Sequence, residues 1–344
     1  MVEPDARLAL LEDWLSRDLN LRVASIEPAS SDASFRRYFR AVCTDGTYVV
    51  MDAPPGREDV RPYLRVSKLL EPLGIHVPHV HAADVERGWV LLEDLGTTPY
   101  LRRLGEPGAA DALYADALAT LARLQLHGAS AAGALAPYDR VALRREMDLM
   151  PEWFLARHLR LSLPEQTRAA LEATFEWLIE EALAQPEVFV HRDYHSRNLM
   201  VTAAGNPGVI DFQDALRGPV GYDLVSLLKD CYIAWPRERV CAWVSRYRTQ
   251  LGGSALAGRD EGEFLRWFDL IGVQRHLKVL GIFARLWHRD GKRGYLGDLP
   301  LTLRYVRETC RLYAQLAPLG ALLEGRIAAE LPRANARALC EPAT

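Results

Sequence analysis

Residues 190–201, VHRDYHSRNLMV, combine polar side chains in a way that suits phosphoryl transfer. Asp193 is a carboxylate that could orient an attacking hydroxyl and accept its proton. The apolar residues on both sides are typical of buried strands. We therefore predict a catalytic loop in which Asp193 is the catalytic residue and His191 holds the loop by hydrogen bonding. Asp223, which precedes an apolar helical run, is expected to satisfy exposed amides as a helix cap and to brace this loop.

Two oxygen-bearing residues, Asn198 and Asp211, are suited to bind a divalent metal. Asn198 lies in the same segment, and Asp211 follows a strand-like run in the sequence GVIDFQDA. Hard Mg²⁺ prefers oxygen ligands such as an amide oxygen and a carboxylate. The order HRD, Asn and a strand ending in Asp-Phe is also that of kinases, which use ATP and Mg²⁺. Either short motif alone would mean little, but the combination between strands favours a kinase.

The remaining sequence predicts an α+β, bilobal fold around this loop. The first part shows, in order, a helix over 5–19, strand-like runs between 21 and 54, a helix over 57–74 and strands around the turn at 86–88. After Gly96, helical patterns cover 109–128, 140–160, 165–184, 222–230, 237–251, 259–289 and 300–330, with short strands at 187–190, 199–201 and 208–211. We predict a small antiparallel β N-lobe, residues 1–95, and a large, mostly α-helical C-lobe, residues 96–344.

Composition excludes several other classes of protein. The 344 residues carry a net charge of −3, so no basic field favours nucleic acid as a partner. The five cysteines are scattered, which favours free thiols in a reducing compartment. The N-terminus is acidic and amphipathic rather than signal-like, and no window approaches the ~20 apolar residues of a membrane helix. We expect a cytoplasmic protein with neither membrane association nor an obligate protein partner.

The pattern HxDxHxxN, formed by His191, Asp193, His195 and Asn198, resembles that of the aminoglycoside phosphotransferase and choline kinase superfamily. Members of that superfamily are small-molecule kinases with a protein-kinase-like bilobal fold. His195 points to it rather than to protein kinases, as does the sequence VIDFQDALRGPVGYDLVSLL that follows. The resemblance implies ATP and Mg²⁺ as cofactors and a small-molecule acceptor.

The likeness extends over essentially the whole chain. It is carried by the segments SSDASFRRYFR, VMDAPP, GWVLLEDLG, HRDYHSRNLM and VQRHLKVLGIFARL. Together they look most like the bacterial sugar kinases that phosphorylate N-acetylmuramate and N-acetylglucosamine at the anomeric hydroxyl. This closer resemblance implies a sugar 1-phosphate product and a role in recycling cell-wall sugars.

The predicted nucleotide site lacks the lysine of protein kinases, because Met51 or Asp52 stands near its expected position. Ser31 and Ser34 could present hydroxyls and backbone N–H groups to phosphate instead. Arg40 is also assigned to this site, although a solvated strand face would explain each arginine of RRYFR equally well.

By resemblance, the stretch LLEDLG holds adenine through main-chain groups. The resemblance assigns the carbonyl of Glu93 and the amide of Leu95 to this contact.

Acceptor residues are expected in the helical part of the chain. The candidates are His195, Asp214, Arg217, Tyr232, Trp235 and Arg275. Arg275, Lys278, Arg285 and Arg289 fall near one side of a helix, and a solvated face is the favoured interpretation of such a stripe. The polar run 274–276 nevertheless invites a polar partner such as a sugar carboxylate.

Two alternatives to an amino-sugar kinase stay open. The first is a kinase of another small acceptor, such as an aminoglycoside, choline or homoserine. A polycationic aminoglycoside is disfavoured, because residues 259–300 contain eight Lys or Arg against six Asp or Glu. The second is a non-catalytic nucleotide-binding regulator that lost its lysine, against which the retention of Asp193, Asn198 and Asp211 argues.

Overall fold

The computed structural model describes residues 5–31 and 35–340, and the chain forms two compact units. One unit contains Met1–Pro99 with Asn198–Asp214, and the other contains Tyr100–Arg197 with Ala215–Thr344. This division differs from the one expected from sequence, because Asn198–Asp214 groups with the β-rich unit. The backbone explains the grouping: Val201 N–H donates to the Thr98 carbonyl (2.8 Å) and Val209 N–H to the His76 carbonyl (2.7 Å).

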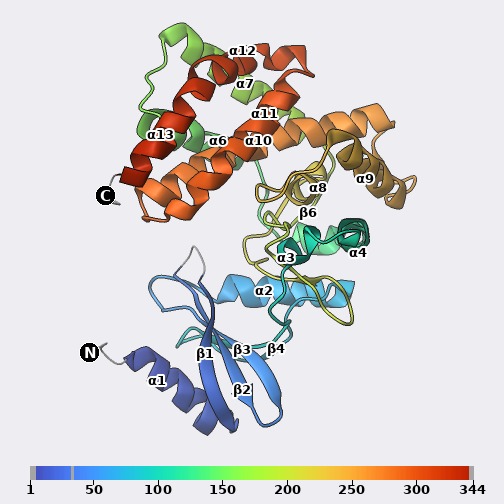
Figure 1. Ribbon diagram of the computed structural model, residues 1–344. Coiled ribbons are helices and arrows are strands. Elements are labelled where there is room, and N and C mark those ends of the chain that lie inside the picture. Colours follow the sequence, from blue (N-terminus) through green and yellow to red (C-terminus); the bar gives the residue numbers. More distant parts are fainter. Residues whose placement is uncertain (1–4, 32–34, 341–344) are drawn as a thin grey trace. The chain divides into compact units, whose positions relative to one another are not determined.

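The β-rich unit is built on a five-stranded antiparallel sheet in the order β1-β2-β3-β5-β4 (Figure 1). The strands are β1 (Val23–Ser31), β2 (Arg37–Cys43), β3 (Gly46–Asp52), β4 (Val80–Asp84) and β5 (Trp89–Glu93). The predicted meander is confirmed. In β2 the buried residues Phe39, Ala41 and Cys43 alternate with more exposed ones, which is the pattern of a strand with one covered face.

A helix at the start of the chain covers one face of this sheet. It consists of α1 (Ala6–Asp13) and a π-helical turn (Trp14–Asp18). Leu11, Trp14 and Leu15 pack with Val50 and Leu91 of the sheet in one buried cluster. Leu8, Leu11, Leu15 and Leu19, spaced three or four residues apart, therefore mark the face that the sheet covers.

The helix α2 (Arg61–Leu70) and a short hairpin complete this unit. The helix continues as a 3₁₀ turn (Glu71–Leu73) and ends at Gly74, which adopts the left-handed conformation at φ 63°. The hairpin pairs β7 (Leu199–Met200) with β8 (Gly208–Val209). A Cβ on Gly208 would lie 2.8 Å from Leu95 Cδ1, so any other residue here would require the Leu95 side chain to shift.

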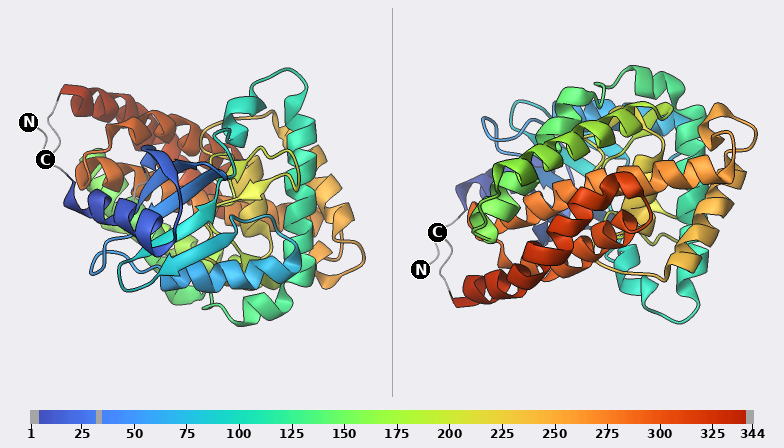
Figure 2. Two further views of the ribbon diagram at one scale, coloured as in Figure 1. Left: turned by 90° about the horizontal axis from the view of Figure 1, so that it is seen from below. Right: turned by 90° about the horizontal axis from the view of Figure 1, so that it is seen from above.

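The second unit is helical, as predicted. Its helices are α3 (Tyr100–Leu104), α4 (Ala109–His127), α5 (Ala129–Gly133), α6 (Arg140–Met147), a π-helical segment (Met150–His158), α7 (Glu165–Leu183), α8 (Gly221–Leu228), α9 (Arg237–Gln250), α10 (Glu261–His288), α11 (Leu299–Cys310), α12 (Ala317–Leu322) and α13 (Ala328–Cys340). The long helix α10 contacts α7, α8, α11 and the π-helical segment, so it is buried on several sides (Figure 2). Among the described residues, no helix combines the length and hydropathy of a membrane span.

Two details of this unit differ from the sequence-based expectation. A strand, β9 (Leu216–Pro219), pairs antiparallel with β6 (Glu187–Val190). It was missed because its sequence, LRGP, contains glycine and proline, which are depleted in strands. The single helix expected over 300–330 is interrupted after Cys310, and Pro318 stands at the start of the next helix.

Candidate active site

The backbone of the predicted catalytic loop is held by a buried carboxylate. Asp223 lies in the first turn of α8 and has no exposed surface. Its carboxylate accepts hydrogen bonds from His191 N–H (2.7 Å) and Arg192 N–H (3.0 Å). Burial raises the pKa of Asp223 to about 7, against the effect of these two donors. The expected brace is thus observed, whereas the cap is not, because the carboxylate bonds the loop instead of its own helix.

Asp193 is fixed by hydrogen bonds within the loop. Its N–H donates to Nδ1 of the buried His191 (3.3 Å), and its carbonyl accepts from His195 N–H (3.0 Å). Burial would raise the pKa of the Asp193 carboxyl, but positive charge from Lys278 and other neighbours holds that pKa below its usual range. The carboxylate is therefore ionised near neutral pH, as a hydrogen-bond acceptor for a hydroxyl must be.

The positive charge near Asp193 belongs to a buried ion network. Arg192 Nη2 lies 2.5 Å and Lys278 Nζ 3.0 Å from Oε1 of Glu146, and Lys278 also donates to Tyr222 Oη (2.9 Å). Lys278 is buried. The interpretation of Arg275, Lys278, Arg285 and Arg289 as a solvated stripe was wrong for its first two members, since Arg275 is buried as well.

The two predicted metal ligands lie together in the β-rich unit. Asn198 precedes β7 and Asp211 follows β8, and the hairpin brings Asn198 Nδ2 within 3.3 Å of Asp211 Oδ2. Asp211 adopts the left-handed conformation at φ 65°. Among the described residues, no group of three or more His, Cys, Asp or Glu could hold a metal. A pair of oxygen donors nevertheless fits Mg²⁺, which proteins bind through one or two carboxylates together with substrate phosphates.

Arg36 is the cation that lies against this pair. Its Nη2 is 3.4 Å from Asp211 Oδ1, and the side chain is only 10% exposed. Met51 is fully buried in the sheet, and the buried carboxylate of Asp52 accepts from Arg7 Nε (2.6 Å) and Arg37 Nε (2.9 Å). Neither residue at the expected lysine position presents a positive charge. Sequence reasoning did not single out Arg36, because nothing in RRYFR tells which arginine reaches Asp211.

Arg40 holds the segment 94–96, which directly follows β5. The Arg40 guanidinium donates to both carboxylate oxygens of Asp94 (2.6 and 2.9 Å) and to the Gly96 carbonyl (3.0 Å). These contacts fix the segment, and the predicted contact of Arg40 with phosphate stays a prediction. Glu93 is the last residue of β5, and its carboxylate accepts from His79 N–H (3.2 Å). Leu95 is buried.

The two serines of the predicted phosphate loop are not described in full. Ser34 lies outside the described residues, and Ser31 is described only as the last backbone position of β1. Their predicted role, like the main-chain contacts of Glu93 and Leu95 with adenine, stays a prediction.

Three of the predicted acceptor residues gather in the helical unit around residues 230–232. The rings of His195 and Tyr232 meet edge to face at 5.6 Å, and Arg275 Nη1 lies 3.8 Å from Cys231 Sγ. This segment is tied to the catalytic loop, because the carboxylate of Asp230 accepts from Ser196 N–H (3.0 Å) and Tyr232 N–H (3.1 Å). Sequence reasoning missed Asp230, which follows Lys229 within a largely apolar stretch.

Three other candidates have different surroundings. Arg217 on β9 pairs with Glu187 of β6 (3.1 Å). Trp235 donates from Nε1 to Tyr114 Oη (2.9 Å) and packs in an aromatic cluster with Trp243. Asp214 is in the β-rich unit, where its carboxylate lies 3.5 Å from Gln213 Nε2. Arg217 and Trp235 therefore do not join the group formed by His195, Tyr232 and Arg275.

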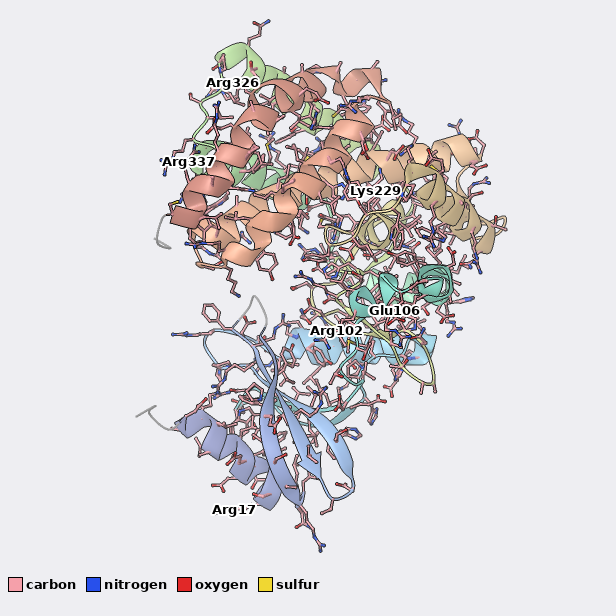
Figure 3. All side chains as sticks on the ribbon, viewed as in Figure 1. Arg17, Arg102, Glu106, Lys229, Arg326 and Arg337 are labelled. Atoms are coloured by element: carbon pink, nitrogen blue, oxygen red, sulfur yellow. The ribbon has the colours of Figure 1, made fainter. Side chains whose placement is uncertain are left out.

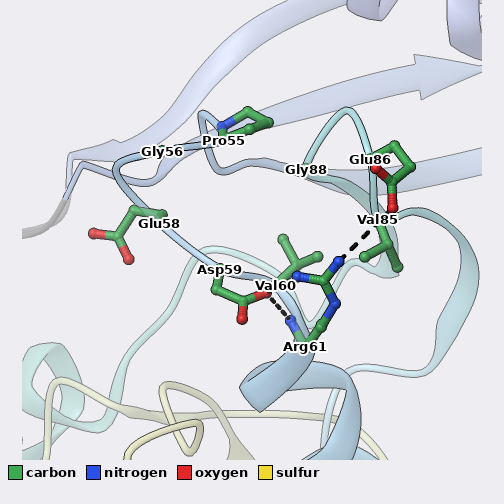
Figure 4. A pocket seen from close by; sticks show the side chains of 9 residues that line it. All are labelled: Pro55, Gly56, Glu58, Asp59, Val60, Arg61, Val85, Glu86 and Gly88. Carbon is green, nitrogen blue, oxygen red and sulfur yellow. Dashed lines mark hydrogen bonds and ion pairs between the residues drawn. The ribbon is translucent and has the colours of Figure 1, made fainter.

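Two surface hollows of the β-rich unit lie apart from the predicted site residues. One of about 320 Å³ lies between the loop at Pro55–Arg61 and the turn at Val85–Gly88, where Arg61 faces Asp59 (3.4 Å) and Glu86 (3.7 Å) (Figure 4). Another, of about 360 Å³, lies along α1 and its π-helical turn. None of the predicted site residues lines either hollow. The site is defined instead by hydrogen bonds and charge.

Comparisons with known proteins cover most of the chain. A profile of the phosphotransferase enzyme family matches residues 25–265. The N-acetylmuramate/N-acetylglucosamine kinase of Pseudomonas aeruginosa is 49% identical over 331 residues, covering 93% of this chain and 96% of that protein. A protein of the same name from Neisseria meningitidis is 48% identical over 318 residues, covering 91% and 94% of the two chains.

Solved structures share the fold at low sequence identity. The choline kinase of Streptococcus pneumoniae matches with a TM-score of 0.62 and 14% identity, covering 88% of this chain and 100% of that one. An ADP-bound aminoglycoside phosphotransferase matches with a TM-score of 0.57 and 18% identity, covering 89% and 99%. The predicted kinase-like α+β fold is confirmed. Together with the profile match and the close relatives, these findings show that the chain belongs to the phosphotransferase enzyme family.

Proposed function

We propose that this protein is an ATP- and Mg²⁺-dependent kinase that phosphorylates the anomeric hydroxyl of N-acetylmuramate and N-acetylglucosamine. The observation that carries the proposal is the braced loop that holds an ionised Asp193 five residues before Asn198, which contacts Asp211. Relatives that are 46–49% identical over at least 91% of this chain are named as kinases of these two sugars.

Asp193 orients the sugar hydroxyl in this proposal. The hydroxyl oxygen forms a bond to the γ-phosphorus of ATP, the bond between that phosphorus and the β,γ-bridging oxygen breaks, and ADP leaves. Asp193 accepts the hydroxyl proton. An anomeric hydroxyl is more acidic than an ordinary alcohol, so the carboxylate need only take the proton late in the reaction.

Asn198 and Asp211 would hold Mg²⁺, which when bound supplies positive charge to the triphosphate. The fixed distance between the two side chains comes from the β7–β8 hairpin, in which Ile210 N–H donates to the Asn198 carbonyl (3.0 Å). Holding ligands on a short hairpin limits their movement and so favours a defined metal geometry.

Arg36 is the residue that we assign to the missing lysine's task, because its guanidinium can bind phosphate oxygens. Arg36→Met is expected to raise the KM for ATP about tenfold, as expected for the loss of one charge-assisted contact, with little change in the KM for sugar. Initial rates at varied ATP measure this effect. Arg17→Met is the control, since Arg17 is a highly exposed residue of the same unit (Figure 3). An unchanged KM for ATP would show that Arg36 only neutralises Asp211.

The proposed function is tested by an acceptor screen. The purified protein is incubated with ATP, Mg²⁺ and, separately, N-acetylmuramate, N-acetylglucosamine, an aminoglycoside, choline and homoserine, and products are identified by mass spectrometry. We expect phosphate only on the two amino sugars, and NMR should place it on the anomeric oxygen. Phosphate on another acceptor or another sugar position would refute the assignment. If the protein binds ATP but forms no product with any acceptor, the alternative of a non-catalytic nucleotide-binding regulator would be favoured.

A further inference from the structure

Arg275 is a buried guanidinium without the carboxylate partner that a buried charge normally requires. Its side chain lies in the middle of α10 and the residue is only 4% exposed. Within residues 5–31 and 35–340, Arg275 forms no ion pair, its Nε has no hydrogen-bond partner, and Nη1 contacts only the weak acceptor Cys231 Sγ (3.8 Å). A donor group of this kind fits an oxygen-bearing ligand.

Other buried cations near Arg275 are each paired with a carboxylate. Lys278, one turn further along α10, is paired with Glu146. Lys229, labelled in Figure 3, lies 3.1 Å from Asp269 Oδ1, and Arg237 contacts the same carboxylate at 2.7 Å. The state of Arg275 is therefore not a general feature of this helical core.

The ring of His195 supplies a second buried polar atom without a partner. Among the described residues, nothing forms a hydrogen bond with its Nδ1. Burial lowers the pKa of His195, so the ring is neutral and offers one N–H donor and one lone pair. The ring packs edge to face on Tyr232, which fixes its plane. A lone pair on Nδ1 would accept a hydrogen bond from a ligand N–H.

Both groups are linked to the loop that carries Asp193. His195 follows Asp193 by two residues and bonds its carbonyl. Arg275 contacts Cys231, the neighbour of Asp230, and Asp230 holds Ser196 of the loop. Burial lowers the pKa of Arg275, but nearby groups that include Asp193 and Asp230 raise it above its usual value, so the guanidinium keeps its charge. A ligand whose hydroxyl is held by Asp193 thus has these two groups within the same cluster.

We propose that Arg275 and His195 bind the acetamido group of the acceptor sugar. Arg275 donates to the acetamido carbonyl oxygen, and Nδ1 of His195 accepts from the acetamido N–H. The inference rests on the proposed function. An amide presents one acceptor and one donor, which match a donor-only guanidinium and a neutral imidazole lone pair.

Sugar geometry favours the acetamido group over the carboxylate that the sequence had suggested. The acetamido nitrogen is attached to C2, next to the anomeric carbon whose hydroxyl faces Asp193. The carboxylate of N-acetylmuramate hangs from C3, one carbon further away. N-acetylglucosamine has no carboxylate, yet relatives are named for both sugars, so the shared acetamido group is the better partner for a buried residue this close to Asp193.

The test compares four acceptors: N-acetylmuramate, N-acetylglucosamine, glucosamine and glucose. In Arg275→Met and in His195→Phe, kcat/KM for both acetylated sugars should fall by about 10- to 100-fold, the effect of losing a buried hydrogen bond, chiefly through KM. For the two sugars without the acetyl group, kcat/KM should change by less than about threefold. Where turnover of these is too slow, their inhibition constants against N-acetylglucosamine are measured instead.

Two controls separate binding from folding. Arg289→Met removes the exposed arginine that caps the C-terminal end of α10 and should change none of these values. The KM for ATP should stay unchanged in both test variants. His195→Phe keeps an aromatic ring that can pack on Tyr232, so this variant still tests the inference if Arg275→Met does not fold.

The outcomes are distinct. A loss of kcat/KM confined to N-acetylmuramate would show that Arg275 binds the sugar carboxylate, and it would overturn the inference. An equal loss for all four sugars would overturn it too, because the acetamido group would then have no special role. Failure of the unchanged protein to phosphorylate any sugar would instead overturn the proposed function, and the inference with it.

Discussion

Asp193→Asn is expected to bind ATP with Mg²⁺ as the unchanged protein does, and to form sugar phosphate about 10²- to 10⁴-fold more slowly, the range for loss of a general base. The amide keeps the size of the carboxylate but cannot accept the hydroxyl proton. The loop should survive the change, because its brace is made by Asp223 and by backbone donors. Rapid-quench assays of sugar phosphate, with nucleotide binding measured by calorimetry, separate the two effects.

The matched control is Asp290→Asn, which changes a carboxylate that lies in the turn after α10 and pairs with Arg289. It should leave kcat within about twofold of the starting value, as substitutions outside a site usually do. Equal turnover by Asp193→Asn and the control would show that another group activates the sugar. Loss of ATP binding in Asp193→Asn would show that Asp193 acts on the nucleotide instead.

Asp211→Asn is expected to lower kcat by at least about 10³-fold, because transition-state charge on the transferring phosphoryl group would lose its metal clamp. Its half-saturating Mg²⁺ concentration should rise by more than about tenfold, as expected when a neutral amide replaces an ionised ligand. Asparagine tolerates the left-handed backbone seen at this position, φ 65°, so the fold should be kept.

Thermal unfolding provides the second readout for Asp211→Asn. Binding of ATP with Mg²⁺ should raise the Tm of the unchanged protein, since a ligand that binds only the folded state stabilises it. In the variant, Mg²⁺ should add little to the stabilisation by ATP alone. Gln213→Ala is a useful companion, because Gln213 donates to Asp211 Oδ1 (2.8 Å) without being a proposed ligand. Unaltered dependence on Mg²⁺ in Asp211→Asn would contradict the metal assignment.

The regular elements could be predicted from the sequence because burial imposes a period on it. Alternating residues in β2 and the leucine spacing of the first helix both mark faces that the same cluster covers. β9 was not predicted, because its pairing with β6 depends on residues distant in the sequence and its own composition disfavours a strand. The end of α11 at Cys310 was missed for a different reason: the helical spacing of apolar residues continues in the sequence beyond the point where the helix stops.

For the site, the predictable part was local. Asp193 and Asn198 lie in one short segment, so their types and spacing were informative. The partner of each arginine could not be predicted, because it is distant in the sequence. Arg40 pairs with Asp94, 54 residues away, and Arg36 lies beside Asp211, 175 residues away. The burial of Arg275 depends on how many helices pack around α10, which no charge pattern along a single helix records.

The grouping of Asn198–Asp214 with the β-rich unit limits how this chain can be divided. The backbone passes from one unit to the other three times, after Pro99, after Arg197 and after Asp214. A fragment ending at Pro99 would carry the sheet but leave the carbonyls of His76 and Thr98 without the hairpin that bonds them, and it would lack Asn198 and Asp211. Neither unit is a transferable module. Recombination at a single point between residues 99 and 198 would separate the five-stranded sheet from the β7–β8 hairpin of the same unit, and so would divide the β-rich unit.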